Sequence, residues 1–347
     1  MDWPGAVSVT GAVRLLGAGD IRGMAGRLGV RPTKKLGQNF VVEPGTVRQI
    51  AALAGVRPGD VILEVGPGLG SLTLGLLEAV VAAAGPLGPG GICGTALYHA
   101  AGGADGDTPA ERDDGASAPA AQPVPPLGPG LIPVRLVAIE IDPVLAGELP
   151  RTIAERAPEL ADRVTVLTAD ALAVGEEEVG APAPTVLAAN LPYNVAVPVV
   201  LRLLAALPSL QRGVVMVQAE VADRMCAGPG SRVYGVPSAK LAWYADARLA
   251  GRVPRSVFWP VPNVDSKLVT FTRRDPPPTT ASREEVFAVI DAAFGQRRKT
   301  LRAALAAWAG SPVAAECVLR AADVDPGARG EALAVADFAR IAQARPG

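Results

Sequence analysis

The hydrophobic and polar positions of the chain predict alternating strands and helices. Short runs of β-branched and apolar residues are typical of strands that a parallel sheet buries on both faces, and stretches of helical period separate them. These runs predict strands at 61–65, 136–140, 164–167, 185–189 and 213–218. The helical stretches are 46–53, 71–81, 143–156, 198–206 and one near Val221. This alternation predicts an α/β fold.

The pattern changes in the middle and at both ends of the chain. Gly, Ala, Pro and Asp dominate residues 82–133 without a sustained period, which predicts a disordered insert. Residues 245–252 and 267–272 have no helix between them, so we expect an antiparallel hairpin. After a Pro-rich linker at 275–278, residues 284–308 and the remainder show helical spacing only. Asp20 is expected to cap a short helix that ends near Leu28.

These elements predict three parts. Residues 1–38 form an N-terminal helix and a basic lead, 39–275 form the α/β domain with the insert at about 82–133, and 282–347 form a small all-helical domain.

Composition narrows the chemistry. The 347 residues are 49% hydrophobic, which is enough for one large core or two smaller ones. Cys93, Cys226 and Cys317 are too few and too scattered for a disulfide framework or a zinc site. His99 is the one histidine and lies in the insert, which excludes Ser-His-Asp, Cys-His and His-rich metal centres. We therefore expect no metal, and chemistry that relies on carboxylates and amides.

The sequence predicts a cytoplasmic monomer. No charged start, apolar run and cleavage site occur in order, and no stretch approaches ~18 uninterrupted apolar residues, so neither a signal peptide nor a membrane partner is expected.

The net charge of −1 conceals a basic remainder. Five acidic residues and one arginine at 105–114 carry −4, which leaves +3 for the rest of the chain. Basic residues gather late, at Arg248, Arg252, Arg255, Lys267, Arg273, Arg274, Arg297, Arg298, Lys299 and Arg302. We interpret Arg248, Arg252 and Arg255, with Arg297–Lys299 on a helix, as a surface for RNA phosphates. The alternative for Arg297–Lys299 is an ordinary solvated helical face.

A glycine-rich turn, Gly66–Gly70, follows the first strand and precedes a helix. Its glycines let the backbone approach a ligand closely, although a tight structural turn remains the alternative. The proline between the glycines and the short spacing do not match the turn that cradles a pyrophosphate.

Polar residues end the next strands. Glu140 could accept two hydrogen bonds from ribose hydroxyls, and Asp170 could accept one from an adenine amino group. A single solvated carboxylate at a strand end is common, but the carboxyl ends of successive parallel strands form the ligand crevice of an open α/β sheet.

Residues 190–193, Asn-Leu-Pro-Tyr, follow the fourth strand. The Asn190 side-chain oxygen and a backbone carbonyl beside Pro192 can both accept from an exocyclic amino group, which aims the nitrogen lone pair at an electrophilic methyl group. Tyr193 offers a face for an extruded base, worth ~1–3 kcal/mol. No general base is needed, so positioning supplies most of the catalysis. The alternative for this segment is a plain turn. Phe258 and Trp259 are expected to pack internally, and Arg232 and Tyr234 are assigned to a substrate loop.

Together these motifs resemble the small-subunit ribosomal RNA adenine dimethyltransferases, the RsmA/KsgA family. The matching segments are 34–40 (KKLGQNF), 64–68 (EVGPG), 140–142 (EID), 170–171 (DA), 190–194 (NLPYN), 262–266 (PNVDS) and 294–302 (FGQRRKTLR). They cover most of the chain outside the insert, which is not part of the family pattern.

The resemblance implies a Rossmann-like class I methyltransferase sheet and an S-adenosylmethionine site. The residues implied to line this site are Asn39, Val41, Gly66, Glu140, Asp170 and Asn190. Asn39 and Val41 would fold over the cofactor as a flap, and Val41 stands where the family usually has leucine. The implied partner is 16S rRNA in an immature small subunit, and the implied substrate is a pair of adjacent adenosines, both dimethylated, in its 3′-terminal hairpin.

Three alternatives are considered. A 23S rRNA adenine dimethyltransferase of the macrolide-resistance type shares the fold and the chemistry, but the segment at 294–302 favours the small-subunit enzyme. A ribosome-assembly factor that acts mainly by binding would not need Asn190–Tyr193. An NAD-dependent oxidoreductase would leave that segment unexplained.

Overall fold

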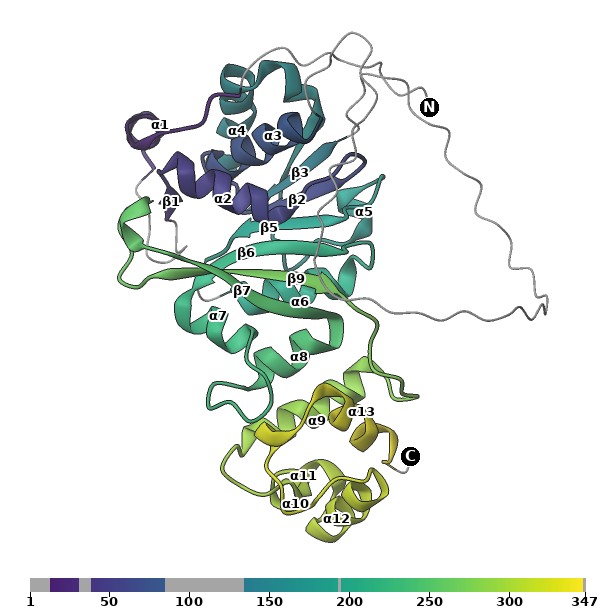
Figure 1. The fold of residues 1–347 in the computed structure, drawn as a ribbon. Coiled ribbons are helices and arrows are strands. Elements are labelled where there is room, and N and C mark those ends of the chain that lie inside the picture. Colours follow the sequence, from purple (N-terminus) through teal and green to yellow (C-terminus); the bar gives the residue numbers. More distant parts are fainter. Residues whose placement is uncertain (1–12, 31–38, 85–133, 193–194, 346–347) are drawn as a thin grey trace, which may run out of the picture.

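The computed structural model describes residues 13–30, 39–84, 134–192 and 195–345. Its centre is a seven-stranded sheet with the order β4-β3-β2-β5-β6-β9-β7 (Figure 1). The strands are β2 Val61–Val65, β3 Arg135–Glu140, β4 Val164–Thr168, β5 Val186–Asn190, β6 Arg212–Gln218, β7 Ala245–Val253 and β9 Ser266–Arg273. The first five in spatial order are parallel, and β9 runs antiparallel to both β6 and β7. The predicted α/β fold and hairpin are confirmed.

Helices cover both faces of the sheet. One face carries α1 Ala18–Arg27, α2 Pro44–Ala54, α3 Ser71–Ala84 and α4 Pro143–Arg156. The other face carries α5 Glu176–Val179, α6 Ala196–Ala206, α7 Ala219–Met225 and α8 Val236–Tyr244. Each face has its own cluster of buried apolar side chains. The chain runs outward from β2 through β3 to β4 and then crosses to β5 and β6 on the other side of β2. The strand order therefore reverses between β2 and β5. Open α/β sheets bind their ligands at such a point.

A second, two-stranded sheet joins distant segments. β1 Phe40–Val41 pairs antiparallel with β8 Phe258–Trp259, with Phe40 opposite Trp259. Their rings are stacked with centroids 6.3 Å apart. Phe258 is buried, which agrees with its predicted packing role. This pairing anchors the segment before α2 near the carboxyl ends of the parallel strands.

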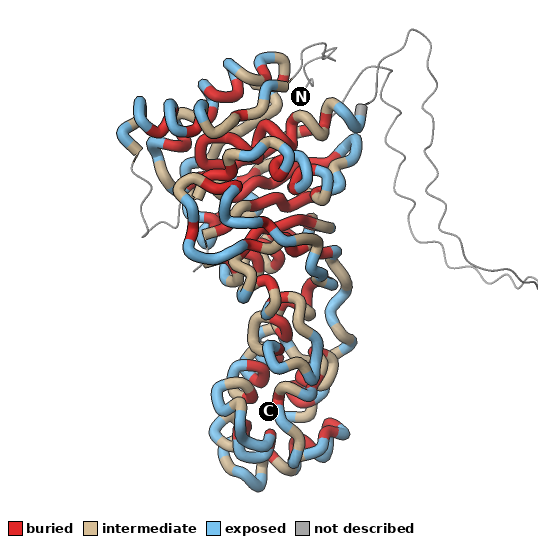
Figure 2. Tube along the Cα trace, turned by 60° about the vertical axis from the view of Figure 1, so that its left-hand side comes forward, coloured by how far each residue is buried: buried red, intermediate tan, exposed pale blue. Residues whose placement is uncertain are grey.

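The C-terminal helices continue one of the two cores. They are α9 Arg283–Gly295, α10 Leu301–Ala304, α11 Ala306–Ala309, α12 Pro312–Ala321 and α13 Val335–Gln343. The Phe287 ring of α9 meets Trp243 and Tyr244 of α8 edge to face. The buried cluster under β5 and β6 therefore extends into these helices, as the buried positions in Figure 2 also show. The exact limits predicted for the three parts of the chain stay a prediction.

Several local predictions were wrong. Asp20 lies in the first turn of α1, where its carboxylate accepts from the Gly17 amide at 2.9 Å, so Gly17 holds the capping position. The helical spacing predicted over 284–308 corresponds to three helices, because α9 ends at Gly295 and the chain turns through 296–300 before α10. Helix α8 was missed because nine residues beginning beside Pro237 offer too few helical repeats. The predicted insert at 82–133 lies almost wholly outside the described residues.

Candidate active site

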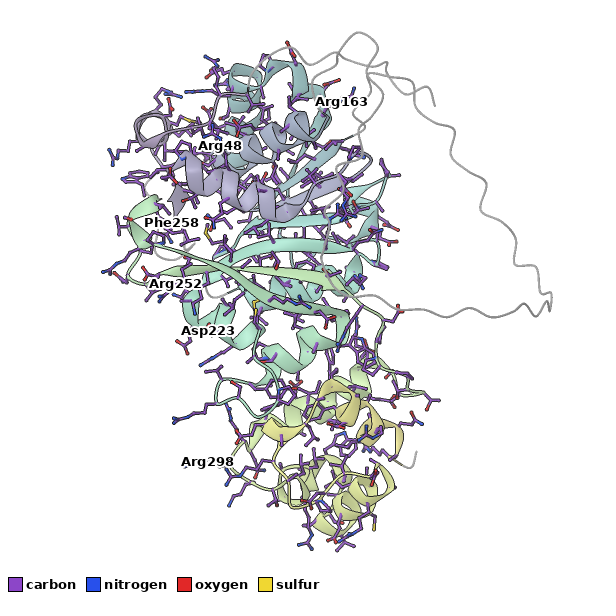
Figure 3. All side chains as sticks on the ribbon, viewed as in Figure 1. Arg48, Arg163, Asp223, Arg252, Phe258 and Arg298 are labelled. Atoms are coloured by element: carbon purple, nitrogen blue, oxygen red, sulfur yellow. The ribbon has the colours of Figure 1, made fainter. Side chains whose placement is uncertain are left out.

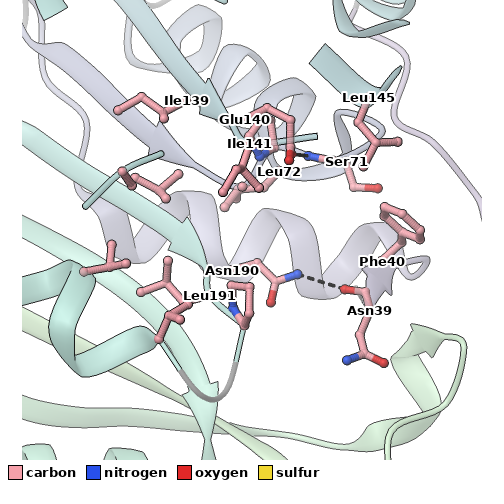
Figure 4. A pocket seen from close by; sticks show the side chains of 18 of the residues that line it. Asn39, Phe40, Ser71, Leu72, Ile139, Glu140, Ile141, Leu145, Asn190 and Leu191 are labelled. Atoms are coloured by element: carbon pink, nitrogen blue, oxygen red, sulfur yellow. Dashed lines mark hydrogen bonds between the residues drawn. The ribbon is translucent and has the colours of Figure 1, made fainter. Parts of the chain in front are cut away.

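A cavity of about 240 Å³ opens at the carboxyl ends of the parallel strands, beside the reversal of strand order (Figure 4). Seven of the predicted site residues line it: Asn39, Val41, Gly66, Glu140, Asp170, Asn190 and Pro192. Tyr193 lies outside the described residues. The cavity therefore gathers residues from β1, β3 and β5, from the position before β1, and from the turns after β2, β4 and β5.

The glycine-rich turn 66–70 lines one side of the cavity. Gly66 and Gly68 adopt left-handed backbone conformations, with φ of 70° and 59°. A side chain at Gly68 would place its Cβ 2.9 Å from the Phe40 ring, and one at Gly66 would approach the Asn190 carbonyl at 3.4 Å. The turn is thus packed between β1 and β5, and only glycine allows both that packing and these dihedral angles.

Glu140 lies at the end of β3, and backbone amides fix its carboxylate. Its Oε2 accepts from the Gly68 amide and its Oε1 from the Asp142 amide, each at 3.0 Å. Burial raises the pKa of Glu140 above its ordinary value, while these two amide donors oppose that rise and the charge of Asp142 adds to it. The carboxylate keeps further lone pairs for hydroxyl donors of a ligand.

Asp170 follows β4 at the cavity rim and is exposed. Its Oδ1 accepts from the Leu172 amide at 2.9 Å, which fixes the turn and leaves the second carboxylate oxygen for another donor. Asp170 and Glu140 stand at the ends of adjacent strands, which pair as far as Glu140 and Thr168.

Asn190 ends β5, and its side-chain amide has one orientation. The Nδ2 group donates to the Asn39 backbone carbonyl at 3.0 Å (Figure 4). A carbonyl cannot accept from the Oδ1 atom, so this contact assigns nitrogen and oxygen within the amide. Oδ1 consequently faces away from Asn39, and none of the residues that the structure describes donates a hydrogen bond to it. The site thus combines an oriented amide oxygen with two carboxylates and a close backbone turn.

Sequence reasoning did not single out the apolar residues of the cavity, among them Ile141, Leu172 and Phe40. Ile141 and Leu172 line the rim with 57% and 38% of their surface exposed, and such apolar side chains suit the faces of a flat aromatic group. Phe40 connects the segment before α2 to the glycine turn. The sequence pattern carried no signal for these residues, because apolar residues next to buried strands look like ordinary core positions.

The candidate RNA-binding residues occupy two places. Arg248 and Arg252 lie in β7, Arg255 follows it, and all three are exposed. Arg297–Lys299 lie in the turn after α9, so their predicted place on a helix was wrong. In Figure 3, Arg252 and Arg298 project on the same side of the molecule, which is also the side where β1 and β8 meet.

The other basic residues of the late cluster bind internally. Arg273 donates to the carbonyls of Leu204, Leu207 and Leu210 and thereby closes the end of α6. The remaining pairs are Lys267 with Asp223, Arg274 with Asp246 and Arg302 with Glu316. Arg273 thus holds the end of α6, and Lys267, Arg274 and Arg302 each have a carboxylate partner within the chain.

Within the described ranges, no group of three or more His, Cys, Asp or Glu side chains is placed to hold a metal ion. No helix in the same ranges is long and apolar enough to cross a membrane.

Comparisons with known proteins agree on one family. A family model described as Ribosomal RNA adenine dimethylase matches residues 30–83 and 133–344. Over 333 residues the chain is 55% identical to a Ribosomal RNA small subunit methyltransferase A from Thermobifida fusca, which covers 96% of this chain and 97% of that protein.

Two solved structures share the fold. The crystal structure of a dimethyladenosine transferase from Plasmodium falciparum aligns with a TM-score of 0.59 at 21% identity, over 86% of this chain and 94% of that one. The structure of the 23S rRNA methyltransferase ErmE aligns with a TM-score of 0.54 at 21% identity, over 88% and 99%.

Proposed function

Because the chain belongs to the ribosomal RNA adenine dimethylase family, we propose that it dimethylates N6 of two adjacent adenosines in the 3′-terminal hairpin of 16S rRNA. The small-subunit relatives favour 16S rRNA over 23S rRNA as the substrate. One structural observation supports the chemistry: Asn190 presents an oriented amide oxygen at the same sheet edge as Glu140 and Asp170.

S-adenosylmethionine supplies a methyl group on a positively charged sulfur when it is bound. Glu140 would accept from the ribose hydroxyls and Asp170 from the adenine amino group. Ile141 and Leu172 would flank the adenine ring, and Asn39, Val41 and Gly66 would contact the remainder. The amide-fixed carboxylate of Glu140 and the close packing of the glycine turn fit such a ligand.

The chain's own residues would position the target amine. Asn190 Oδ1 and a backbone carbonyl beside Pro192 accept its two N–H groups, so the nitrogen lone pair leaves conjugation with the ring. Tyr193 stacks on the extruded base. The pre-set orientation of Asn190 lowers the cost of this arrangement, since the amide need not rotate when the base arrives.

A methylation assay with labelled S-adenosylmethionine tests the proposal. Unmethylated small subunits and bare 23S rRNA are the two substrates, and digested products are read by mass spectrometry. Dimethyladenosine in the 3′-terminal hairpin of 16S rRNA is expected. Product on 23S rRNA alone would assign the chain to the resistance type, and no product on either would favour an assembly factor that acts by binding.

A further inference from the structure

Three consecutive residues of the flap, Asn39, Phe40 and Val41, are held by different elements of the fold. The Asn39 carbonyl accepts from the Asn190 side chain on β5 at 3.0 Å (Figure 4). The Val41 carbonyl accepts from the hydroxyl of Ser71, the first residue of α3, at 2.8 Å. Phe40 lies between these two residues and has no polar side-chain atom, so its side chain is positioned by packing.

Two groups contact the Phe40 ring. One is the glycine-rich turn, because a Cβ added at Gly68 would come within 2.9 Å of the ring. The other is Trp259 of β8, whose ring stacks on Phe40 with centroids 6.3 Å apart and planes inclined by 21°. Offset stacked rings at such a distance attract each other. The half-buried Trp259 therefore fixes a buried side chain that touches the wall of the cavity.

Strand β8 is itself anchored to the main sheet. Arg255 precedes this strand, and its amide donates to the Asp265 carboxylate at 3.3 Å while its guanidinium donates to the Asn263 carbonyl at 3.2 Å. The Asp265 carbonyl in turn accepts at 3.0 Å from the amide of Ala219, which directly follows β6. Trp259 is thus attached to a fixed support, against which β1 pairs.

We propose that Trp259 is a positioning residue for methyl transfer: its stacking on Phe40 fixes the flap, so that the Asn39 carbonyl holds the Asn190 amide in place. This inference rests on the proposed function. Trp259 is not among the residues that line the cavity, so it acts through Phe40. An Asn190 amide that loses its Asn39 acceptor can rotate, and the acceptor for the target amine is then no longer preorganised.

A double-mutant cycle with Asn190 separates this role from two others. If Trp259 acts through Asn190, its removal costs little once the Asn190 side chain is gone. If Trp259 stacks on the target base, its removal lowers transfer by the same factor in both backgrounds. If Trp259 only stabilises the fold, its removal lowers the free energy of unfolding but leaves the transfer rate of the folded protein at saturating cofactor unchanged.

The experiment measures single-turnover methylation of unmethylated small subunits by the full chain at saturating S-adenosylmethionine. We expect Trp259→Ala to lower the rate about five- to twentyfold in the wild type and less than about twofold in Asn190→Ala. Trp259→Phe keeps an aromatic ring opposite Phe40 and should retain at least about half of the wild-type rate. Trp308→Ala, which removes a half-buried tryptophan from α11, is the matched control and should leave the rate unchanged.

Hydrogen exchange supplies a readout that does not depend on the RNA substrate. The Val42 amide donates to the Val257 carbonyl at 2.9 Å, next to the β1–β8 pair. This amide should exchange about three- to tenfold faster in Trp259→Ala than in the wild type, in Trp259→Phe or in Trp308→Ala. If the wild-type chain methylates neither 16S nor 23S rRNA, the proposed function fails while hydrogen exchange still tests the stacking contact.

Four results would overturn the inference. They are an equal loss of transfer in the two backgrounds, a wild-type rate for Trp259→Ala, a Trp259→Phe rate as low as that of Trp259→Ala, and exchange at Val42 that Trp259→Ala does not accelerate. Where Trp259→Ala fails to fold, Trp259→Leu, which keeps an apolar side chain in β8 without a ring, takes its place in the same cycle.

Discussion

The carboxamide nitrogen of Asn190 donates to the backbone carbonyl of Asn39 across 3.0 Å, although 151 positions separate the two residues in the sequence. The carbonyl belongs to the segment that leads into β1, and β1 in turn pairs with β8. Orientation of the Asn190 amide therefore depends on a part of the chain far from the strand that carries it. The flap and the proposed catalytic residue form one unit.

Asn190→Ala should reduce methyl transfer at least about a hundredfold, the loss that follows removal of one preorganised hydrogen-bonding group. Cofactor affinity should change little, because Glu140 and Asp170 remain. Single-turnover methylation measures the first quantity and calorimetry with S-adenosylmethionine measures the second. Asn39→Ala keeps the backbone carbonyl, so its loss of transfer at saturating cofactor should be much smaller. Transfer by Asn190→Ala at the wild-type rate would refute the mechanism.

Glu140→Gln should weaken binding of S-adenosylmethionine about ten- to hundredfold, as expected when a buried charged acceptor is lost. An amide in this place cannot accept from both the Gly68 and Asp142 amides and also from ribose hydroxyls. Calorimetry measures the dissociation constant. Glu78→Gln, which changes a half-buried carboxylate on α3 that pairs with Arg48 outside the cavity, is the control. An unchanged dissociation constant for Glu140→Gln contradicts its ribose role.

Cofactor affinity should also depend on pH through Glu140. Burial raises its pKa, so the carboxyl group takes up a proton at a higher pH than an ordinary glutamate. The neutral acid accepts fewer hydrogen bonds, and affinity should therefore fall as the pH is lowered through this raised pKa. The same titration in Glu140→Gln should be flatter. A wild-type affinity that rises toward acidic pH would have the wrong sign.

Gly68→Ala should destabilise the fold by about 1–2 kcal/mol, because its φ of 59° is unfavourable for alanine. The added Cβ would also meet the Phe40 ring at 2.9 Å and displace β1, so cofactor affinity should fall as well. Gly147→Ala is the control: it lies in α4 with no atom within 4 Å of the added Cβ and should stabilise by about 0.5–1 kcal/mol. Denaturant unfolding measures both variants. Equal stability effects would exclude the steric explanation.

The sequence predicted the sheet and the polar residues at its carboxyl edge because both follow from local patterns, whereas Asn39 and Val41 were expected only from the family resemblance. Buried strands are continuous apolar runs, and the polar residues that interrupt them at Glu140, Asp170 and Asn190 lie at the same sheet edge. No side-chain contact needs to be known for that inference, since the carboxyl ends of parallel strands always meet at one edge.

The missed features depend on contacts between distant segments. In the sequence, Arg297, Arg298 and Lys299 look like three equivalent charges. In the structure, however, Arg297 pairs with Glu331 and donates to the Arg232 carbonyl. Tyr234 lies in the loop before α8, as predicted, but the local sequence gives no sign that its hydroxyl donates to the Leu333 carbonyl or that its ring packs against Phe294. Two-residue strands such as β1 and β8 have no period at all, so a sequence pattern cannot predict their pairing.

Glu64 provides a test of the buried core beneath the site. Its side chain lies within β2 at 0% exposure. Oε2 accepts from the Thr73 hydroxyl at 2.7 Å, whereas Oε1 has no hydrogen-bond partner among the described residues. Burial raises the pKa of Glu64 to about 8, and the nearby charge of Glu140 adds to the rise although the Thr73 hydrogen bond opposes it. The folded chain therefore holds Glu64 protonated at a pH where the unfolded chain ionises it.

Stability should consequently fall as pH rises from about 5 to about 8, by at most about 1.4 kcal/mol per pH unit from this group. The contribution is complete below the unfolded pKa and is lost as pH rises through the folded value. Glu64→Gln cannot ionise, so its stability relative to the wild type should increase with pH. Urea unfolding of both proteins at pH 5, 6.5 and 8 measures the free energy of unfolding of Glu64→Gln minus that of the wild type. If this value stays constant or decreases as the pH rises, Glu64 ionises in the fold as easily as in the unfolded chain.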